Sequence, residues 1–135
     1  MTSLFYAGIL GLMFVVLSIN IVVSRRKLKI ALGDDDLIIK RKIRAQGNFA
    51  EYTPFFLILL YMIEKNGTSF LTINILGVLF VIARIFHAYS LLKAEKYVDG
   101  KITANPIWRV LGMVTTFGCI ISVSMIAIFT SFSQN

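Results

Sequence analysis

The sequence is poor in the residues that build disulfides and most metal sites. It has one cysteine and one histidine among 135 residues, so an intrachain disulfide is excluded. Cys119 has no histidine or cysteine neighbour at metal-ligand spacing, and we expect no metal site. A glycine-rich phosphate loop, a pair of histidines four residues apart and a serine nucleophile elbow are also missing. The usual nucleotide-binding and hydrolase signatures are therefore excluded, and a nucleophile would have to come from a bound cofactor.

Acidic residues are scarce as well, with 7 Asp and Glu against 14 Lys and Arg, giving a net charge of +7. The basic residues lie at the ends of apolar runs, where they set membrane topology and meet anionic lipid head groups. Hydrophobic residues make up 57% of the chain, and the mean hydropathy is +0.79. The composition predicts an integral membrane protein with no nucleic-acid partner, and the length suits a single domain over residues 1–135.

Four apolar stretches are long enough to cross a bilayer, at about 20 residues per crossing. They cover residues 4–24, 44–63, 70–92 and 106–132. The second helix should begin before its apolar part, near Asp36, because Asp34 to Asp36 can cap a helix and favour its positive end. No internal repeat or linker divides the chain. We predict an all-α, integral membrane four-helix bundle.

The distribution of lysine and arginine predicts the orientation of the spans. The first connection, including Arg44, holds eight basic residues, the second holds only Lys65, and the third holds three, followed by Arg109. The positive-inside rule then places the first and third connections in the cytoplasm and both termini on the other side. A site at this end of the spans would face the cytoplasm or the inner leaflet.

The second span carries a polar face where it enters the membrane. At about 100° per residue, Arg44, Asn48 and Glu51 share this face. Charged groups at this depth are costly and usually face a protein interior or a polar cavity. Glu51 needs a partner, for which Arg84 is the first candidate and Arg44 the second. Glu51 either holds two helices together or binds an ammonium group of a ligand, and the two roles are compatible.

The third and fourth spans add further cations. Arg84 and His87 are three residues apart and share a face of the third span. A planar guanidinium suits a carboxylate, whereas His87 is either an interhelical contact or a ligand contact. Arg25 and Arg109 stand at span ends, where basic residues anchor topology. This set of arginines with one glutamate and one asparagine suits a ligand with carboxylates and an amine, such as a peptide-like thiol.

The residues in three of the spans resemble those of a known family. Residues 44–54 read RAQGNFAEYTP, a signature similar to that of the membrane-associated proteins in eicosanoid and glutathione metabolism, the MAPEG family. Ala83 and Arg84 with His87 look like the family's third-helix motif. Residues 109–113, RVLGM, leading to Thr115 and Thr116, are similar to the fourth-helix pattern of bacterial members. The chain is therefore identified as a member, of the bacterial type.

The resemblance implies a homotrimer of four-helix protomers that binds glutathione between neighbouring subunits. It implies the following glutathione-binding residues: Arg44, Gln46, Asn48, Glu51, Tyr52 and Arg84. His87 stands where leukotriene-forming members carry a tyrosine, and it remains a candidate contact. Arg25 matches an arginine thought to stabilise the glutathione thiolate, and Arg109 is a weaker candidate for this role. A nearby cation lowers the pKa of a thiol and so favours the nucleophilic thiolate.

The expected function is that of a membrane-bound, glutathione-dependent transferase or peroxidase. Its second substrate would be a hydrophobic electrophile or a lipid hydroperoxide that arrives from the bilayer, and the expected location is a bacterial inner membrane. Some members of the family bind lipid without catalysis, which is one alternative. A small proton-coupled exporter is the other, and in an exporter the intramembrane glutamate should be unpaired.

Overall fold

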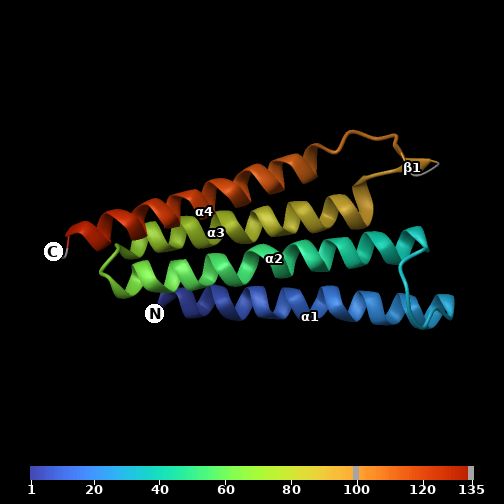
Figure 1. Ribbon diagram of the computed structural model, residues 1–135, viewed down its shortest axis with the longest axis horizontal. Helices are drawn as coiled ribbons and strands as arrows, with labels where there is room; N and C mark the ends of the chain where they lie inside the picture. Colours follow the sequence, from blue (N-terminus) through green and yellow to red (C-terminus); the bar gives the residue numbers. More distant parts are fainter. Residues whose placement is uncertain (99–100, 134–135) are drawn as a thin grey trace.

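Four long helices run side by side along the longest axis of the molecule (Figure 1). The computed structural model describes residues 1–98 and 101–133. The elements are α1 (Thr2–Leu28), α2 (Leu37–Lys65), α3 (Phe70–Tyr89), a π-helical turn η1 (Ser90–Ala94), β1 (Tyr97–Val98), β2 (Lys101–Ile102) and α4 (Ile107–Ser133). The start of α1 and the end of α4 lie at one end of the bundle, and β1, which pairs with β2, lies beyond the other end (Figure 1). The predicted all-α bundle is confirmed.

Local sequence signals account for the helix boundaries. The Asp36 carboxylate accepts hydrogen bonds from the backbone of Ile38 and Ile39, at 2.8 and 3.0 Å, so the predicted cap of α2 is confirmed. Ser69 caps α3 by accepting from the Thr72 amide. Gly67, between α2 and α3, has a φ of 85°, which glycine adopts without a steric cost. A π-helical turn, η1, follows α3 where the third span ends. This turn was not predicted from the sequence.

The outside of the bundle is apolar along most of its length. Large hydrophobic side chains are exposed on all four helices, among them Leu12, Phe55, Leu79 and Phe129. Three segments, Thr2–Leu28, Phe70–Ala94 and Ile107–Phe132, are long and apolar enough to span a membrane. Helix α2 does not meet this criterion, although we predicted a span there. It is long enough, but the polar face of its first half lowers its hydropathy.

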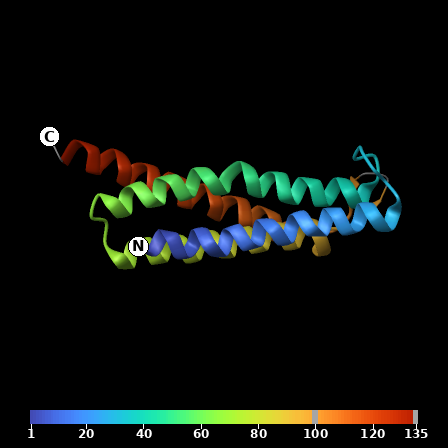
Figure 2. The same cartoon turned by 90° about the horizontal axis from the view of Figure 1, so that it is seen from below.

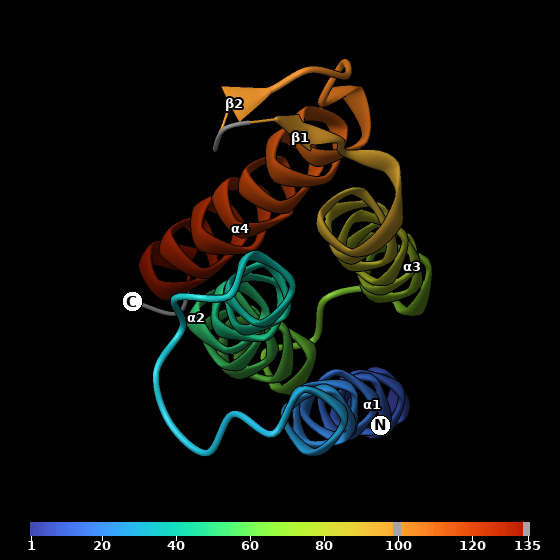
Figure 3. The same cartoon turned by 90° about the vertical axis from the view of Figure 1, so that its right-hand side faces the viewer.

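The helices enclose a core of aromatic and aliphatic side chains. Viewed from the end, α1 packs on α2 and α3, and α4 packs on the same two helices (Figure 3). Phe56 of α2 and Phe80 of α3 stack with ring centroids 3.8 Å apart. The ring of Tyr6 lies directly against Gly77, and its hydroxyl donates to Asn74 Oδ1 at 2.8 Å. These contacts tie α1, α2 and α3 together in the half of the bundle that lies away from Arg44 and the polar face of α2.

Helix α1 begins beside the turn that joins α2 to α3 (Figure 2). The carboxylate of Glu64 there accepts hydrogen bonds from the amides of Thr2 and Ser3 and from the Ser3 hydroxyl. It thus satisfies first-turn donors that have no partner within α1 and lies at the positive end of this helix. Partial burial opposes ionisation, but the hydrogen bonds from Ser3 and Thr2 outweigh it and lower the pKa of Glu64 to about 2.

Replacing Glu64 with glutamine should lower the Tm in detergent at neutral pH by roughly 2–4 °C. Because the folded-state pKa lies below the ordinary value of 4.5, the ionised carboxylate stabilises the fold above pH 4.5. This stabilisation is lost as the pH falls from 4.5 towards 2, so the two melting curves should converge over that window. Thermal unfolding followed by circular dichroism measures the difference. Lys65→Gln is the control, and a Glu64→Gln difference that does not change with pH would contradict this account.

Candidate functional site

A cavity of about 390 Å³ lies between α2, α3, η1 and α4, in the half of the bundle that carries the polar face of α2. It is lined by Arg44, Asn48, Tyr52, His87, Leu91, Arg109, Val110, Met113, Val114 and Phe117. One wall is basic and hydrogen-bonding, and the wall formed by α4 is apolar beyond Arg109 at its start. Val114 and Phe117 on that wall are also exposed on the outside of the bundle. The cavity can therefore hold a charged ligand beside an apolar one.

Arg84 lies directly behind the polar wall and is 1% exposed. Its guanidinium donates to Asn48 Oδ1 at 2.5 Å and to Thr116 Oγ1 at 3.2 Å. It also lies 5.9 Å from the ring centroids of Phe49 and Tyr52. Among the described residues, no carboxylate pairs with it, and its Nε has no partner. A buried cation without a counter-charge gives the cavity wall a positive potential, which favours an anionic ligand.

His87 lines the cavity because α4 approaches α3 closely beside it. A Cβ atom at Gly112 would lie 2.8 Å from both the backbone carbonyl oxygen of Ala83 and the backbone nitrogen of His87. Only glycine therefore allows α4 to approach α3 this closely. His87 is 3% exposed, and within the described residues its Nδ1 has no hydrogen-bond partner. An unsatisfied buried nitrogen is costly unless a ligand or water completes it. The predicted ligand-facing position of His87 is thus compatible with the structure.

Arg109 is held by a buried glutamate that we did not single out from the sequence. Its Nε lies 3.3 Å from Glu95 Oε1, and the side chain of Glu95 is 0% exposed. Ser90 donates to the same carboxylate at 2.9 Å, and the Tyr97 hydroxyl also donates to it. Burial, together with this hydrogen bond and the charge of Glu95, raises the pKa of Tyr97. Glu95 fixes Arg109 at the rim of the cavity. In the sequence, Glu95 could have been recognised as an acidic residue that stands between lysines.

Replacing Glu95 with glutamine should release Arg109 from this position. The expected cost is about 2 kcal/mol of unfolding free energy, because hydrogen bonds to a charged group are lost in a buried site. Ligand affinity should fall as Arg109 becomes mobile. Chemical unfolding in mixed micelles measures the first effect, and Lys96→Gln on the neighbouring exposed residue is the control. A variant as stable as the wild type would show that Glu95 does not anchor this region.

A second cavity of about 400 Å³ adjoins the first, because both are lined by Arg44, Leu91 and Arg109. Its other lining residues are Asp35, Leu37, Lys40, Arg41 and Tyr97. Arg41 donates to the Glu95 carbonyl oxygen at 2.9 Å and lies 4.9 Å from the centre of the Tyr97 ring. Four cations therefore line this second cavity, which gives an anion a basic path to the first.

Several predicted site residues lie elsewhere than we expected. Glu51 pairs with Arg44 at 3.6 Å, so the second of its two candidate partners is correct and the first, Arg84, is wrong. Gln46 points to α1, where its amide donates to Ser18 Oγ at 3.4 Å, and it does not line the cavity. Two residues along the helix turn a side chain by about 200°, which separates Gln46 from the face of Arg44 and Asn48.

Arg25 also lies apart from the cavity. At the end of α1 its guanidinium donates to the carbonyl oxygen of Gly33 at 2.9 Å and to that of Ala31 at 3.5 Å. It thus holds the connection between α1 and α2, and within one chain it does not meet Arg44 or Arg109. The predicted cluster is divided accordingly: Arg44, Asn48, Tyr52, His87 and Arg109 line the cavity, Arg84 lies behind it, and Gln46 and Arg25 face other parts of the fold.

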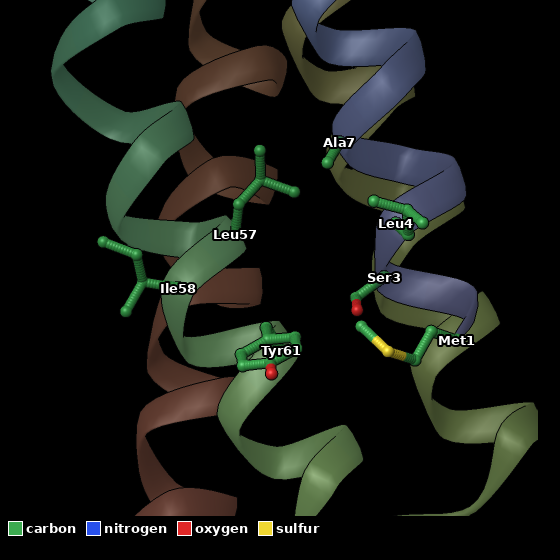
Figure 4. A pocket seen from close by; sticks show the side chains of 7 residues that line it. All are labelled: Met1, Ser3, Leu4, Ala7, Leu57, Ile58 and Tyr61. Atoms are coloured by element: carbon green, nitrogen blue, oxygen red, sulfur yellow. The ribbon is translucent and has the colours of Figure 1, made fainter.

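A further cavity, of about 320 Å³, lies between the start of α1 and the second half of α2 (Figure 4). In the picture Met1, together with Ser3, Leu4 and Ala7 of α1, lies across from Leu57 and Tyr61 of α2, and Ile58 lies on the outer side of α2. These side chains are uncharged, and the cavity lies at the end of the bundle opposite to the arginines. None of its lining side chains offers a counter-charge to a ligand with carboxylates, so we assign the candidate site to the cavity between α2, α3 and α4.

The fold and the cavity define a membrane protein built as a four-helix bundle with an interior cavity that basic residues line. The chain belongs to the MAPEG family, whose sequence model matches residues 3–129. It is similar to the inner membrane protein YecN of Escherichia coli strain K12, with 30% identity over 91 residues, covering 67% of this chain and 70% of YecN. YecN of E. coli O6:H1 strain CFT073 matches to the same extent.

The family membership confirms the resemblance deduced from the motifs in α2, α3 and α4. It places the chain among membrane proteins associated with eicosanoid and glutathione metabolism. The apolar helices and the inner membrane protein in E. coli agree on a membrane location. The name of YecN states a location and no reaction.

Proposed function

We propose that this protein is a glutathione-dependent transferase or peroxidase that acts on hydrophobic electrophiles or lipid hydroperoxides within the membrane. The observation that most supports this function is that the two walls of the cavity differ in polarity. Basic and hydrogen-bonding residues of α2 and α3 form one wall, and Val110, Met113, Val114 and Phe117 of α4 form the other. A thiol peptide and an apolar substrate each find a matching surface there.

The donor set fits glutathione, which has two carboxylates, one ammonium group and a thiol. Arg44 on the cavity wall suits one carboxylate, and Arg84 adds positive potential for the other from behind the wall. Glu51, beside Arg44, suits the ammonium group. Asn48 and the unpartnered Nδ1 of His87 can hydrogen bond to the peptide groups. The volume lies within the usual range for small-ligand sites, about 300–1,000 Å³.

The protein's residues would bind the ligand, orient it and favour the thiolate. Bound glutathione supplies a sulfur nucleophile that displaces a leaving group from an electrophile, or two molecules reduce a hydroperoxide to an alcohol and water as they form a disulfide. Arg109, held by Glu95, is the cation on this cavity best placed to stabilise a thiolate. The apolar wall of α4 excludes water and strengthens this interaction.

Arg25 enters the proposal only through a neighbouring subunit. It lies at the end of α1 and does not line the cavity of its own chain. In a homotrimer with sites between subunits, α1 of one protomer would bring Arg25 to the cavity of the next. With the basic connections in the cytoplasm and both termini outside, this site would receive glutathione from the cytosol.

A proton-coupled exporter is the less favoured candidate. Such a protein needs a carboxylate that is free to exchange a proton for a cationic substrate. Glu51 instead lies 3.6 Å from Arg44, and Arg84 and Arg109 add positive charge around it. A cation would be repelled from this cavity. A non-catalytic lipid-binding protein would have the same cavity. Only the presence or absence of turnover distinguishes it from the proposed enzyme.

Replacing Arg44 with glutamine should weaken glutathione binding about tenfold, because a charge-assisted contact to a carboxylate is lost. The Arg44 side chain is 64% exposed, so the Tm should remain that of the wild type. Calorimetric titration in detergent measures the affinity, and ultraviolet absorbance of the bound thiolate reports ionisation. Turnover is followed with an aryl halide and with a fatty-acid hydroperoxide.

Arg26→Gln, an exposed change at the end of α1, is the matched control. Wild-type protein that shows no saturable binding at millimolar glutathione would overturn the proposal. Tight binding without turnover of either substrate would favour the non-catalytic alternative. Transport of a cationic dye that is abolished by Glu51→Gln would favour the exporter.

A further inference from the structure

A separate cavity, of about 510 Å³, lies between α1, α2 and the end of α3, and none of its lining residues borders the arginine-rich cavities. Lys42 and Lys93 form its charged rim, Asn20 lies beside Lys42, and Ile85 and Leu92 contribute to an apolar wall. Ile85 is 48% exposed, so this wall continues onto the outer surface of the bundle. The cavity therefore opens towards the bilayer.

Lys42 is half-buried and has only neutral partners. Its ammonium group donates to Asn20 Oδ1 at 2.6 Å and to the Ser24 hydroxyl, which leaves one of its three donors free. Burial and the nearby charges of Lys27 and Lys93 lower the pKa of Lys42. In the part of the chain that the structure describes, no carboxylate pairs with any of these three lysines.

Lys42 and Lys93 at the rim, with Lys27 nearby, lie above an apolar wall that opens to lipid, and this arrangement fits an amphiphile with an anionic head. Each cation near a membrane surface attracts anionic lipid by about 1 kcal/mol. A soluble anion would satisfy the lysines but leave Ile85 and Leu92 without a partner, whereas an acyl chain covers them. The basic connections at this end of the bundle also favour the leaflet that is rich in anionic lipid.

We propose that this cavity is a binding site for an anionic phospholipid. The phosphate lies between Lys42 and Lys93, with Asn20 as a further polar partner, and one acyl chain runs along Ile85 and Leu92. The site is separate from the glutathione site, so either proposal can fail without the other. A lipid bound there links α1 to the end of α3 and should stabilise the bundle.

Native mass spectrometry of the detergent-purified full chain tests this proposal with phosphatidylglycerol as the probe. We expect saturable binding of phosphatidylglycerol and much weaker binding of phosphatidylcholine with the same acyl chains. Lys42→Gln and Lys93→Gln should each weaken phosphatidylglycerol binding about fivefold. Lys93 is exposed and has no hydrogen bond to another helix in the described chain, so its variant remains informative if Lys42→Gln fails to fold. Lys101→Gln, at the same end but outside the cavity, is the matched control and should bind as the wild type does.

Three results would overturn the proposal. Equal binding of phosphatidylcholine would show that charge does not select the occupant. Competition by glycerol phosphate at the same concentration as the lipid would show that the site takes a soluble anion. An equal loss of binding in Lys101→Gln would show a diffuse attraction to the basic surface in place of a built site. Glutathione affinity is measured on the same variants and should not change.

Discussion

Replacing Gly112 with valine is expected to force α3 and α4 apart and to destabilise the bundle by about 3 kcal/mol. A Cβ atom at this position would lie 2.8 Å from two backbone atoms, the carbonyl oxygen of Ala83 and the nitrogen of His87. Backbone atoms inside a helix cannot rotate away as a flexible side chain can, so the whole helix must move. Thermal unfolding in detergent should show a Tm lower by roughly 10 °C.

The same change should weaken ligand binding, because the helices that separate carry opposite walls of the cavity. His87 would move with α3, and Met113 and Val114 with α4. Gly118→Ala is the matched control on α4, since a Cβ atom there has nothing within 4 Å. If Gly112→Val melts with the wild type, α3 and α4 are not held at the distance described here.

The architecture could be predicted from the sequence because membrane helices leave a simple pattern. Long apolar runs predicted four helices, and α1, α3 and α4 also meet the criteria for membrane spans. Asp36 was predicted to begin α2 because a carboxylate that accepts from free amides marks a helix start. The strands β1 and β2 were not predicted, since two-residue strands in a polar connection have no hydrophobic alternation.

The candidate site could be predicted in part. Helical spacing grouped Arg44 and Asn48 correctly, because residues four apart share a face whatever the tertiary fold. Pairing across helices could not be predicted in the same way, since it depends on the depth and rotation of each helix. For this reason Glu51 was assigned first to Arg84, and Glu95 was not recognised as the anchor of Arg109.

Replacing Arg84 with methionine should separate its effect on binding from its effect on stability. The buried guanidinium is costly to desolvate, and its hydrogen bonds to Asn48 and Thr116 offset this cost only in part. Methionine has a similar volume and no charge, so we expect the free energy of unfolding to change by less than about 1 kcal/mol. Glutathione affinity should fall roughly thirtyfold, the value for losing a charge about 8 Å from a carboxylate at an effective dielectric constant of about 20.

Asn48→Asp also tests whether the charge of Arg84 contributes to binding, because it neutralises this charge instead of removing it. It keeps Arg84 and gives it a carboxylate at a position now 2.5 Å from the guanidinium, so the fold should be at least as stable as the wild type. The added negative charge cancels the potential of Arg84 at the cavity wall, and glutathione affinity should fall by a similar factor. Calorimetric titration at two salt concentrations distinguishes this electrostatic effect from a structural one, because screening weakens only the former. Suppose instead that Arg84→Met unfolds readily while its folded fraction binds glutathione normally. Arg84 would then be a structural residue, and the uncompensated charge behind the wall would have no part in binding.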